Sequence, residues 1–378
     1  MMNILVAPDS FKDCMRAIEV AEALSLGLRK VIPEAEIRML PMADGGEGTV
    51  ESLIDATGGE IVDLQVHDPL MRTITSFYGI SGDASTAVIE MAAASGLELL
   101  ESGERNPWIT STFGTGELIH QALERGCRRI LLGIGGSATN DAGMGMASAL
   151  GVRFLDGQGK LVSQGGGALG DVKQISMEGL DPRIADTEIM VACDVTNPLS
   201  GPQGASFVYG PQKGADRKMA EGLDENLSHL ACLISEQLGK EVDTIPGAGA
   251  AGGLGAGLMA FLGARLVKGF DMVAETVSLE EAIQWADLVI TGEGKMDSQT
   301  RFGKTPFGVA QMAKKHGKSV IGVAGTLEED AVDLYKEGFD LLLSIQEKPI
   351  DLEAALENAP QLLERTGERI GRMLGICL

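Results

Sequence analysis

Positive charge is scarce in this 378-residue chain, in which 31 lysines and arginines stand against 54 aspartates and glutamates. The formal net charge of −23 argues against nucleic acid or an acidic membrane surface as the main partner, although a small anion can still bind in a locally basic pocket. The five cysteines show no Cys-x-x-Cys spacing, which argues against a zinc site or a disulfide framework and fits a reducing cytoplasm. No basic leader and no apolar run long enough to span a bilayer is present, so we expect a cytoplasmic protein.

Aromatic residues are few as well, at 4 % of the chain, whereas hydrophobic residues make up 44 % and there are 51 glycines. This balance is typical of α/β enzymes with many strand-to-helix turns. Two common catalytic motifs are missing. Residues 298–305 miss a Walker A loop because Ser298 stands where glycine is required, and no Gly-x-Ser-x-Gly elbow accompanies the four histidines, which we interpret as structural.

Both ends of the chain show the same alternation of strands and helices. The apolar runs at 4–7, 37–41, 287–291, 319–324 and 340–345 predict buried strands of a parallel sheet. From 61 to 91, extended segments separated by Asp-Pro and Gly-Asp turns instead predict antiparallel hairpins. We therefore predict an α/β protein with two domains: a parallel-sheet domain formed by residues 1–60 and 272–378, and an inserted α/β domain with a mixed sheet over 61–271.

The stretch 287–305 joins a predicted strand to a predicted helix. It contains two glycines that free the backbone, two carboxylates that can hold a cation and two lysines that can hold an anion; these are Gly292, Gly294, Glu293, Asp297, Lys295 and Lys304. Thr305 is the expected N-cap of the helix, with Pro306 in its first turn, and the unpaired N–H groups at such an end favour an anion. We interpret the stretch as a phosphate site, with a tight strand-to-helix turn as the alternative.

A strand order of 2-1-3-4-5 would place the first strand beside the strand at 287–291. Ligands of open parallel sheets bind beyond the carboxyl ends of the strands, where the connections reverse direction. The order brings four polar residues next to the phosphate stretch: Asp9, Ser10, Lys12 and Asp44. The inserted domain is expected to face this edge across a cleft, where it presents Asn140, Asp141, Asp194 and Asn197.

Residues 247–252 match Gly-x-Gly-x-x-Gly, with Asp271 at a distance suited to a ribose contact. A dinucleotide fingerprint needs a strand directly before its first glycine, whereas the segment 242–246 is short and ends in proline. We interpret the motif as part of a closely packed helix from about 250 to 262, and keep a nucleotide-dependent oxidoreductase as an alternative function. Ser278 to Glu281 predicts a capping box at the start of another helix.

Five blocks of the sequence resemble the bacterial glycerate kinases, which phosphorylate D-glycerate. They begin with Ala-Pro-Asp-Ser-Phe-Lys and Pro-Met-Ala-Asp-Gly-Gly-Glu-Gly-Thr, and in order they occupy residues 7–12, 41–49, 133–145, 193–198 and 291–304. The resemblance covers nearly the whole chain. It implies ATP and a divalent cation, Mg²⁺, a flavodoxin-like domain with an inserted mixed-sheet domain, and phosphorylation of the 2-hydroxyl to give 2-phosphoglycerate.

Phosphoryl transfer needs a divalent cation on oxygen ligands, positive groups for the moving phosphoryl and a means of orienting the attacking hydroxyl. We expect catalytic roles for Lys12, Asp44, Asp194 and Lys295, with Asp194, Glu293 and Asp297 as metal ligands. The substrate-binding candidates are Asp9, Ser10, Phe11, Ser137, Asn140, Asp141 and Asn197, and the nucleotide- or phosphate-binding candidates are Gly292, Gly294, Gly303, Lys304 and Thr305. Phosphorylation of the 3-hydroxyl and a non-catalytic hydroxy-acid sensor are the remaining alternatives, and the sequence gives no indication of the oligomeric state.

Overall fold

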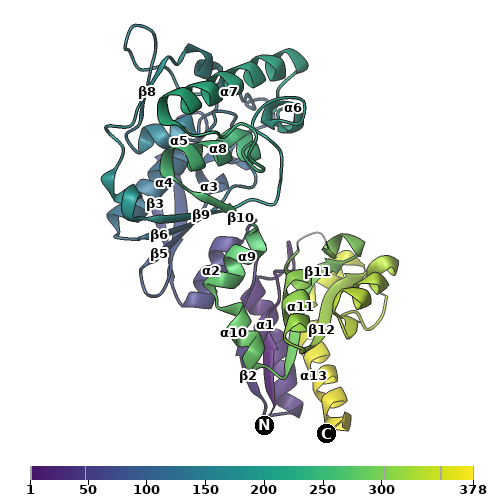
Figure 1. The fold of residues 1–378 in the computed structure, drawn as a ribbon. Coiled ribbons are helices and arrows are strands. Elements are labelled where there is room, and N and C mark those ends of the chain that lie inside the picture. The colour runs from purple at the N-terminus through teal and green to yellow at the C-terminus, as the bar shows by residue number, and fades with distance from the viewer. Residues whose placement is uncertain (1, 47, 302–303, 350, 378) are drawn as a thin grey trace. The chain divides into compact units, whose positions relative to one another are not determined.

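The computed structural model describes residues 2–377 except 47, 302–303 and 350. The chain divides into two compact units, which are described in turn. Unit 1 comprises Met1–Asp44, Glu51–Gly58 and Phe270–Leu378, and unit 2 comprises Gly45–Val50 and Gly59–Gly269. Both chain ends, purple and yellow in Figure 1, belong to unit 1. None of the helices in the described residues combines the length and apolar character needed to cross a membrane.

Unit 1 is built on a five-stranded parallel sheet with the order β13-β12-β11-β1-β2. The strands are β1 (Asn3–Val6), β2 (Glu36–Met39), β11 (Leu288–Met296), β12 (Ser319–Leu327) and β13 (Leu341–Ser344). Ile4 pairs with Leu288 on one side and with Ile37 on the other. The predicted order 2-1-3-4-5 is confirmed, and the continuous apolar run of β1 is buried as expected of a central parallel strand.

Two helices of unit 1, α1 (Ala17–Val31) and α13 (Ala359–Cys377), pack closely against each other. Glycines permit this approach: a Cβ on Gly27 would lie 1.9 Å from Glu364 O, and one on Gly367 would lie 2.2 Å from Leu24 O. The other helices are α10 (Leu279–Trp285), α11 (Thr305–Lys315), α12 (Leu352–Glu357) and the 3-10 helices η5 (Ser298–Arg301) and η6 (Glu329–Glu337), while α2 (Thr49–Thr57) and α9 (Gly269–Thr276) run across the boundaries of the units.

Unit 2 is built on a six-stranded mixed sheet with the order β10-β9-β6-β5-β4-β3. The strands are β3 (Glu60–His67), β4 (Thr73–Ile80), β5 (Thr86–Glu90), β6 (Arg129–Gly133), β9 (Glu188–Ala192) and β10 (Arg265–Val267). The predicted hairpins are confirmed, because β3, β4 and β5 pair antiparallel, whereas β5, β6, β9 and β10 pair parallel. A small sheet of β7 (Arg153–Leu155) and β8 (Gln174–Ser176) is separate.

The helices of unit 2 bury a continuous core on this sheet. They are α3 (Ala92–Ser95), α4 (Phe113–Glu124), α5 (Met144–Ala149), α6 (Ala205–Tyr209), α7 (Arg217–Leu238) and α8 (Ala250–Leu262), with the 3-10 helices η1 (Leu97–Leu99), η2 (Gly166–Asp171), η3 (Pro182–Asp186) and η4 (Pro211–Lys213). The predicted small-residue helix is confirmed as α8. Turn rather than strand precedes it, so the dinucleotide fingerprint lacks its strand.

Three local predictions are wrong. The strand β11 does not end before Gly292 but runs on to Met296, because β12 continues to pair with it as far as Leu327. The helix α11 begins at Thr305, with Lys304 rather than Thr305 as its N-cap. The expected capping box at Ser278 is absent, since this residue is left-handed (φ 53°) and its side chain makes no capping hydrogen bond.

Candidate active site

The carboxyl end of β1 lies beside the middle of β11 in unit 1. Backbone pairing continues past the end of β1, where Asp9 N donates to Gly292 O at 2.8 Å. The chain before Asp44 is tied to the same edge, because Met42 N donates to Pro8 O at 2.9 Å. Three carboxylates from three neighbouring strands are thus brought to this edge: Asp9, Asp44 and Glu293.

Asp9 has a strongly perturbed carboxyl. Burial, together with the negative charges of Asp44 and Glu293, raises its pKa from 3.8 to about 7. The Thr305 hydroxyl and the Ser10 N–H, which donates to Asp9 Oδ1 at 2.7 Å, act in the opposite direction. A carboxyl that titrates near neutrality is typical of a functional site.

Glu293 is buried within β11 and is held by two side chains of the following segment. Its Oε1 accepts from Thr300 Oγ1 at 2.8 Å, and its Oε2 accepts from Lys304 Nζ at 2.9 Å. Burial raises the pKa of Glu293, and the bond from Lys304 opposes this shift. Lys304 at the N-terminus of α11 is therefore positioned by Glu293, in the place where an anion would meet the first N–H groups of the helix.

Lys295 lies two residues further along β11 and is exposed. Its Nζ lies 2.9 Å from Glu328 Oε1 and 3.8 Å from Asp297 Oδ2, and the bond to Glu328 raises the pKa of Lys295. The two lysines predicted to hold phosphate are each paired with a carboxylate. Because Lys295 is exposed, exchanging its partners for a ligand phosphate costs little.

The remaining predicted site residues of unit 1 differ in how far their side chains are exposed to solvent. Lys12 is exposed and Ser10 is partly exposed. The Phe11 side chain is only 4 % exposed and packs in the core around β1, so its predicted contact with substrate stays a prediction. Gly292 and Gly294 lie within β11, and Gly303 lies outside the described residues.

In unit 2, the loop that follows β6 is anchored by Asp141, which is fully buried. Its carboxylate accepts from Thr112 N (2.8 Å), Gly143 N (3.1 Å) and Gly145 N (3.1 Å), and also from Thr112 Oγ1. Burial raises the pKa of Asp141, and these bonds oppose the shift. Both oxygens are engaged in holding the loop, which gives Asp141 a structural role, and its predicted substrate contact stays a prediction.

Asn140 and Ser137 on this loop are also buried. Asn140 Nδ2 donates to Ser206 Oγ at 2.9 Å, whereas Asn140 Oδ1 has no partner among the described residues. Ser137 Oγ lies in a cluster with Thr139 and Ala251 O. An unpartnered buried acceptor is rare in native proteins, and it leaves Asn140 with capacity for one more hydrogen bond.

Asp194 and Asn197 follow the carboxyl end of β9, the strand next to β6. Asp194 is exposed and accepts from Gly269 N at 3.2 Å. Asn197 Oδ1 accepts from Tyr209 Oη at 2.6 Å, and its Nδ2 donates to Gln203 O at 2.8 Å. Their positions at a parallel sheet edge suit ligand binding, but the amide of Asn197 is already occupied by its neighbours.

One residue at this edge was missed by the sequence analysis. Lys213, at the end of η4, is 2 % exposed, and its Nζ donates to Thr139 O at 2.7 Å and to Ser137 Oγ at 3.3 Å. Burial lowers its pKa to about 7, and the negative charge of Asp141 opposes this shift. Its sequence context, Gly-Pro-Gln-Lys-Gly, is that of an ordinary exposed turn. Only the fold reveals that the lysine is buried.

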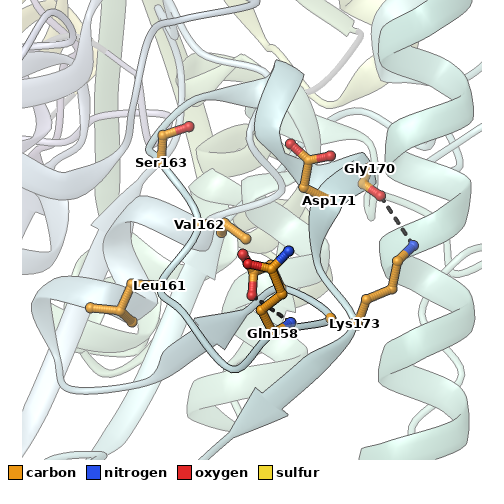
Figure 2. A pocket seen from close by; sticks show the side chains of 9 residues that line it. Gln158, Leu161, Val162, Ser163, Gly170, Asp171 and Lys173 are labelled. Carbon is orange, nitrogen blue, oxygen red and sulfur yellow. Dashed lines mark hydrogen bonds between the residues drawn. The ribbon is translucent and has the colours of Figure 1, made fainter.

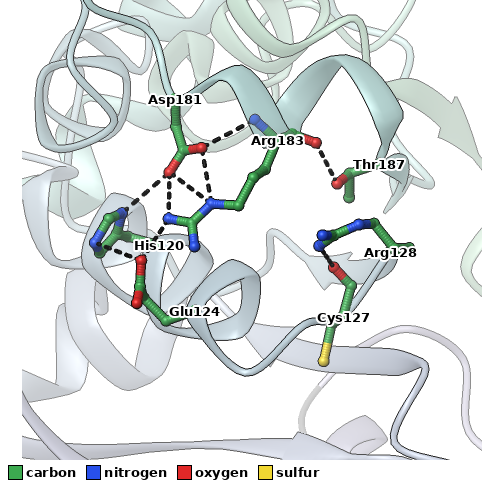
Figure 3. A network of polar contacts seen from close by, with 7 residues as sticks. All are labelled: His120, Glu124, Cys127, Arg128, Asp181, Arg183 and Thr187. Atoms are coloured by element: carbon green, nitrogen blue, oxygen red, sulfur yellow. Dashed lines mark hydrogen bonds and ion pairs between the residues drawn. The ribbon is translucent and has the colours of Figure 1, made fainter.

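The histidines have local structural contacts. His120 on α4 lies 3.4 Å from Asp181 and 3.9 Å from Glu124, and Arg183 joins the same two carboxylates at 2.6 Å each (Figure 3). This network ties α4 to η3. The other contacts are those of His67 with Glu117, His229 with Val172 O and His316 with Glu280. These local contacts agree with the interpretation of the histidines as structural, which stays a prediction.

An open hollow of about 690 Å³ lies around the loops between β7 and β8 (Figure 2). Its polar lining includes Asp156, Gln158, Ser163, Asp171 and Lys173. Lys173 Nζ is turned toward Gly170 O at 3.4 Å, and none of the predicted site residues lines the hollow. Its openness to solvent and the absence of predicted site residues from its lining argue against a role in catalysis.

The carboxylates offer oxygen donors of the kind that Mg²⁺ prefers. Within the described part of the chain, however, no three His, Cys, Asp or Glu side chains are grouped so as to hold a metal ion. Glu293 and Asp297 belong to unit 1, whereas Asp194 belongs to unit 2, and both oxygens of Glu293 are already bonded. These donors fit a cation that arrives on nucleotide phosphates and meets one or two carboxylates, rather than a resident ion in a protein cage.

Taken together, the parallel sheet of unit 1, the mixed sheet of unit 2, the carboxylates at their edges and the lysines of the 295–304 segment define a two-unit α/β enzyme suited to phosphoryl transfer. The model of the glycerate kinase family matches residues 4–375. The chain belongs to this family. It is therefore a kinase, for which the family implies glycerate as acceptor and ATP as phosphoryl donor, and the resemblance seen in the sequence is confirmed.

Named relatives agree with this assignment. The chain is 52 % identical to a glycerate kinase of Bacillus subtilis (100 % of this chain, 98 % of the relative) and 50 % identical to a glycerate 2-kinase of Escherichia coli (99 % and 98 %). A crystal structure from Salmonella typhimurium LT2, of a protein assigned as glycerate kinase 2, superposes with a TM-score of 0.92 at 48 % identity over 99 % of this chain and 98 % of that one. The oxidoreductase and sensor alternatives are set aside by the family.

Proposed function

We propose that the chain transfers the γ-phosphoryl group of ATP to the 2-hydroxyl of D-glycerate, giving 2-phosphoglycerate and ADP. The observation that carries the proposal is the meeting of carboxylates and lysines at the edge of the unit 1 sheet, in a chain of this family. The choice of the 2-hydroxyl is supported by the name of the Escherichia coli relative, glycerate 2-kinase. Phosphorylation of the 3-hydroxyl is the competing function.

The proposed roles follow the charges of the unit 1 edge. Lys295 and Lys304 neutralise phosphate oxygens, and the N–H groups at the start of α11 add to this field. Lys12 stabilises the transferred group or the glycerate carboxylate. Asp44 orients the attacking hydroxyl, and Asp9 binds the hydroxy acid with the help of Ser10.

Unit 2 is proposed to contribute polar groups from its own sheet edge. Asn140 Oδ1, the unpartnered acceptor, would receive a substrate hydroxyl. Mg²⁺ is proposed to enter with ATP and to be contacted by Asp297 or Asp194. Bound Mg²⁺ would neutralise charge on the β- and γ-phosphates.

The experiment that tests the regiochemistry is phosphorus NMR of the product formed from D-glycerate and MgATP. The expected product carries its phosphate on the secondary carbon, so that the phosphorus couples to one proton. Coupling to the two protons of a methylene group would identify 3-phosphoglycerate and refute the proposal. The roles are tested with Lys12→Ala and Asp297→Asn: if both variants retained wild-type kcat/KM, the assignment of the site would be wrong.

A further inference from the structure

Lys213 is a buried lysine without an ion-pair partner among the described residues. A buried ammonium is costly unless its hydrogen bonds and a counter-charge compensate for lost hydration. The Asp141 carboxylate acts on it only at a distance, because its oxygens are bonded to the loop itself. The sequence therefore retains a destabilising group at this position, which points to a role other than folding stability.

The main contact of Lys213 is the carbonyl oxygen of Thr139, at 2.7 Å. The same oxygen is approached from another side by Gly252, where an added Cβ would lie only 1.9 Å away. Ala142 N donates to Gly252 O at 3.1 Å, so the loop is bonded to the turn that contains Gly252 as well as packed against it. Ser137 Oγ, the second contact of Lys213, also reaches Ala251 O at 3.3 Å.

The turn that receives these contacts has an unusual backbone. Ala251, Gly252 and Gly253 have φ values of 53°, 67° and 87°, three successive residues in the left-handed region at the start of α8. For Ala251, which has a Cβ, this conformation costs on the order of 1 kcal/mol, and such residues cluster at functional sites. The structure must hold the turn in place, and the bonds to residues 137–142 do so.

We propose that Lys213 is a positioning residue of the kinase: by gripping the Thr139 carbonyl and Ser137, it fixes loop 137–142 against the turn 251–253 in the arrangement that presents Asn140 to the hydroxy-acid substrate. The amide of Asn140 is already oriented by its bond to Ser206, which leaves Oδ1 as the acceptor. The part of this inference that concerns substrate rests on the proposed function, whereas the grip on the loop does not.

The charge of Lys213 gives the inference a signature in pH. Its pKa of about 7 means that the ammonium, the stronger donor to Thr139 O, is lost as the pH rises through neutrality. Asp141, whose own pKa is raised by burial, is the acidic side chain that acts on it from the loop, and Tyr209 on α6, which packs against η4, has a raised pKa and remains neutral in this range. Gly214, the residue after Lys213, lies close to the backbone carbonyl oxygen of Arg105.

The test compares Lys213→Met, which keeps the side-chain volume and removes the charge, with Lys240→Met. Lys240 is a matched control in unit 2, since its Nζ donates to the carbonyl of Ala260 at 2.6 Å without touching the loop. The measurements are KM for D-glycerate and kcat between pH 6 and pH 9, and amide hydrogen exchange of residues 137–142 and 251–253 in the protein without ligands.

We expect Lys213→Met to raise KM for D-glycerate about tenfold at pH 6, the value of one charged hydrogen bond, with a smaller effect on kcat. The ratio of variant to wild-type KM should fall toward one at pH 9, where wild-type Lys213 is also neutral, and this ratio isolates Lys213 from other groups that titrate nearby. Exchange at Ala142, whose N–H bonds to Gly252, should accelerate in Lys213→Met and remain unchanged in Lys240→Met.

Unchanged amide hydrogen exchange in Lys213→Met would overturn the inference that Lys213 holds residues 137–142 in place. Faster exchange with a KM ratio near one at every pH would overturn the link to substrate, and a raised ratio that does not fall toward pH 9 would overturn the role of the lysine charge. A product phosphorylated at the 3-hydroxyl would refute the proposed function while leaving both results for Lys213 in force, so the two failures are distinguishable.

Discussion

The buried carboxyl of Asp9 should make unit 1 less stable as the pH rises. Its pKa is raised from 3.8 to about 7 by burial, so the folded state binds a proton that the unfolded state releases between these values. Below pH 4 Asp9 is protonated in both the folded and the unfolded state, so it does not change the free energy of unfolding. Between pH 4 and pH 7 the free energy of unfolding falls as the pH rises. Each pH unit contributes about 1.4 kcal/mol.

Asp9→Asn, which mimics the protonated form, should therefore stabilise the protein. The expected gain in unfolding free energy is about 2 kcal/mol at pH 5 and roughly 4 kcal/mol at pH 8, where it reaches its plateau. The same variant should have a lower kcat/KM. The wild-type protein keeps the Asp9 carboxylate although it costs stability, which indicates that the carboxylate serves the reaction.

The assay is urea unfolding in EDTA without nucleotide, followed by tryptophan fluorescence. The chain has two tryptophans, and Trp108 belongs to unit 2 whereas Trp285 belongs to unit 1 with Arg38 stacked 4.5 Å from its ring centroid. In a Trp108→Phe background the signal reports unit 1 alone, which avoids mixing the transitions of two units.

A matched control for sign is Glu280→Gln on α10 of the same unit. The hydrogen bond from His316 lowers the pKa of Glu280, so this carboxylate stabilises the fold above its usual pKa, and its removal should destabilise the protein between pH 5 and pH 8. A gain for Asp9→Asn that is absent, or that shrinks as the pH rises, would refute the reasoning.

Two further predictions concern packing and pairing. Lys304→Met leaves Glu293 buried without its cation and should cost about 1–2 kcal/mol in urea unfolding, because Lys304 is partly exposed; adding Glu293→Gln should restore stability but not kcat. Gly252→Ala should cost more than about 2 kcal/mol, since the new Cβ would meet Thr139 O, whereas Gly263→Ala at the same positive φ but in open space should cost only about 1 kcal/mol. Equal thermal shifts for the two glycine variants would contradict the close contact.

Much of the fold could be predicted because its signals are local. A buried parallel strand such as Ile4–Val6 needs a continuous apolar run, and the hairpins need alternation with turn residues between them. The order of the unit 1 strands followed from the connections, and the adjacency of Asp9 and Gly292 followed from that order. Where local signals were equivocal the prediction failed: Gly292 suggested a turn, but pairing with β12 keeps it in a strand.

The sequence by itself determined which residue types are available and at which strand ends they stand, because periodicity, turn chemistry and motif order are properties of neighbouring residues. Only the tertiary structure decided which of them are buried, bonded or charged. Phe11 became core and Asp141 a loop anchor, although both stand in motifs that suggest contact with a ligand. Lys213 became buried through contacts with Thr139, 74 residues away, and its pKa depends on that burial. Desolvation and hydrogen bonding between distant segments exist only once the chain has folded.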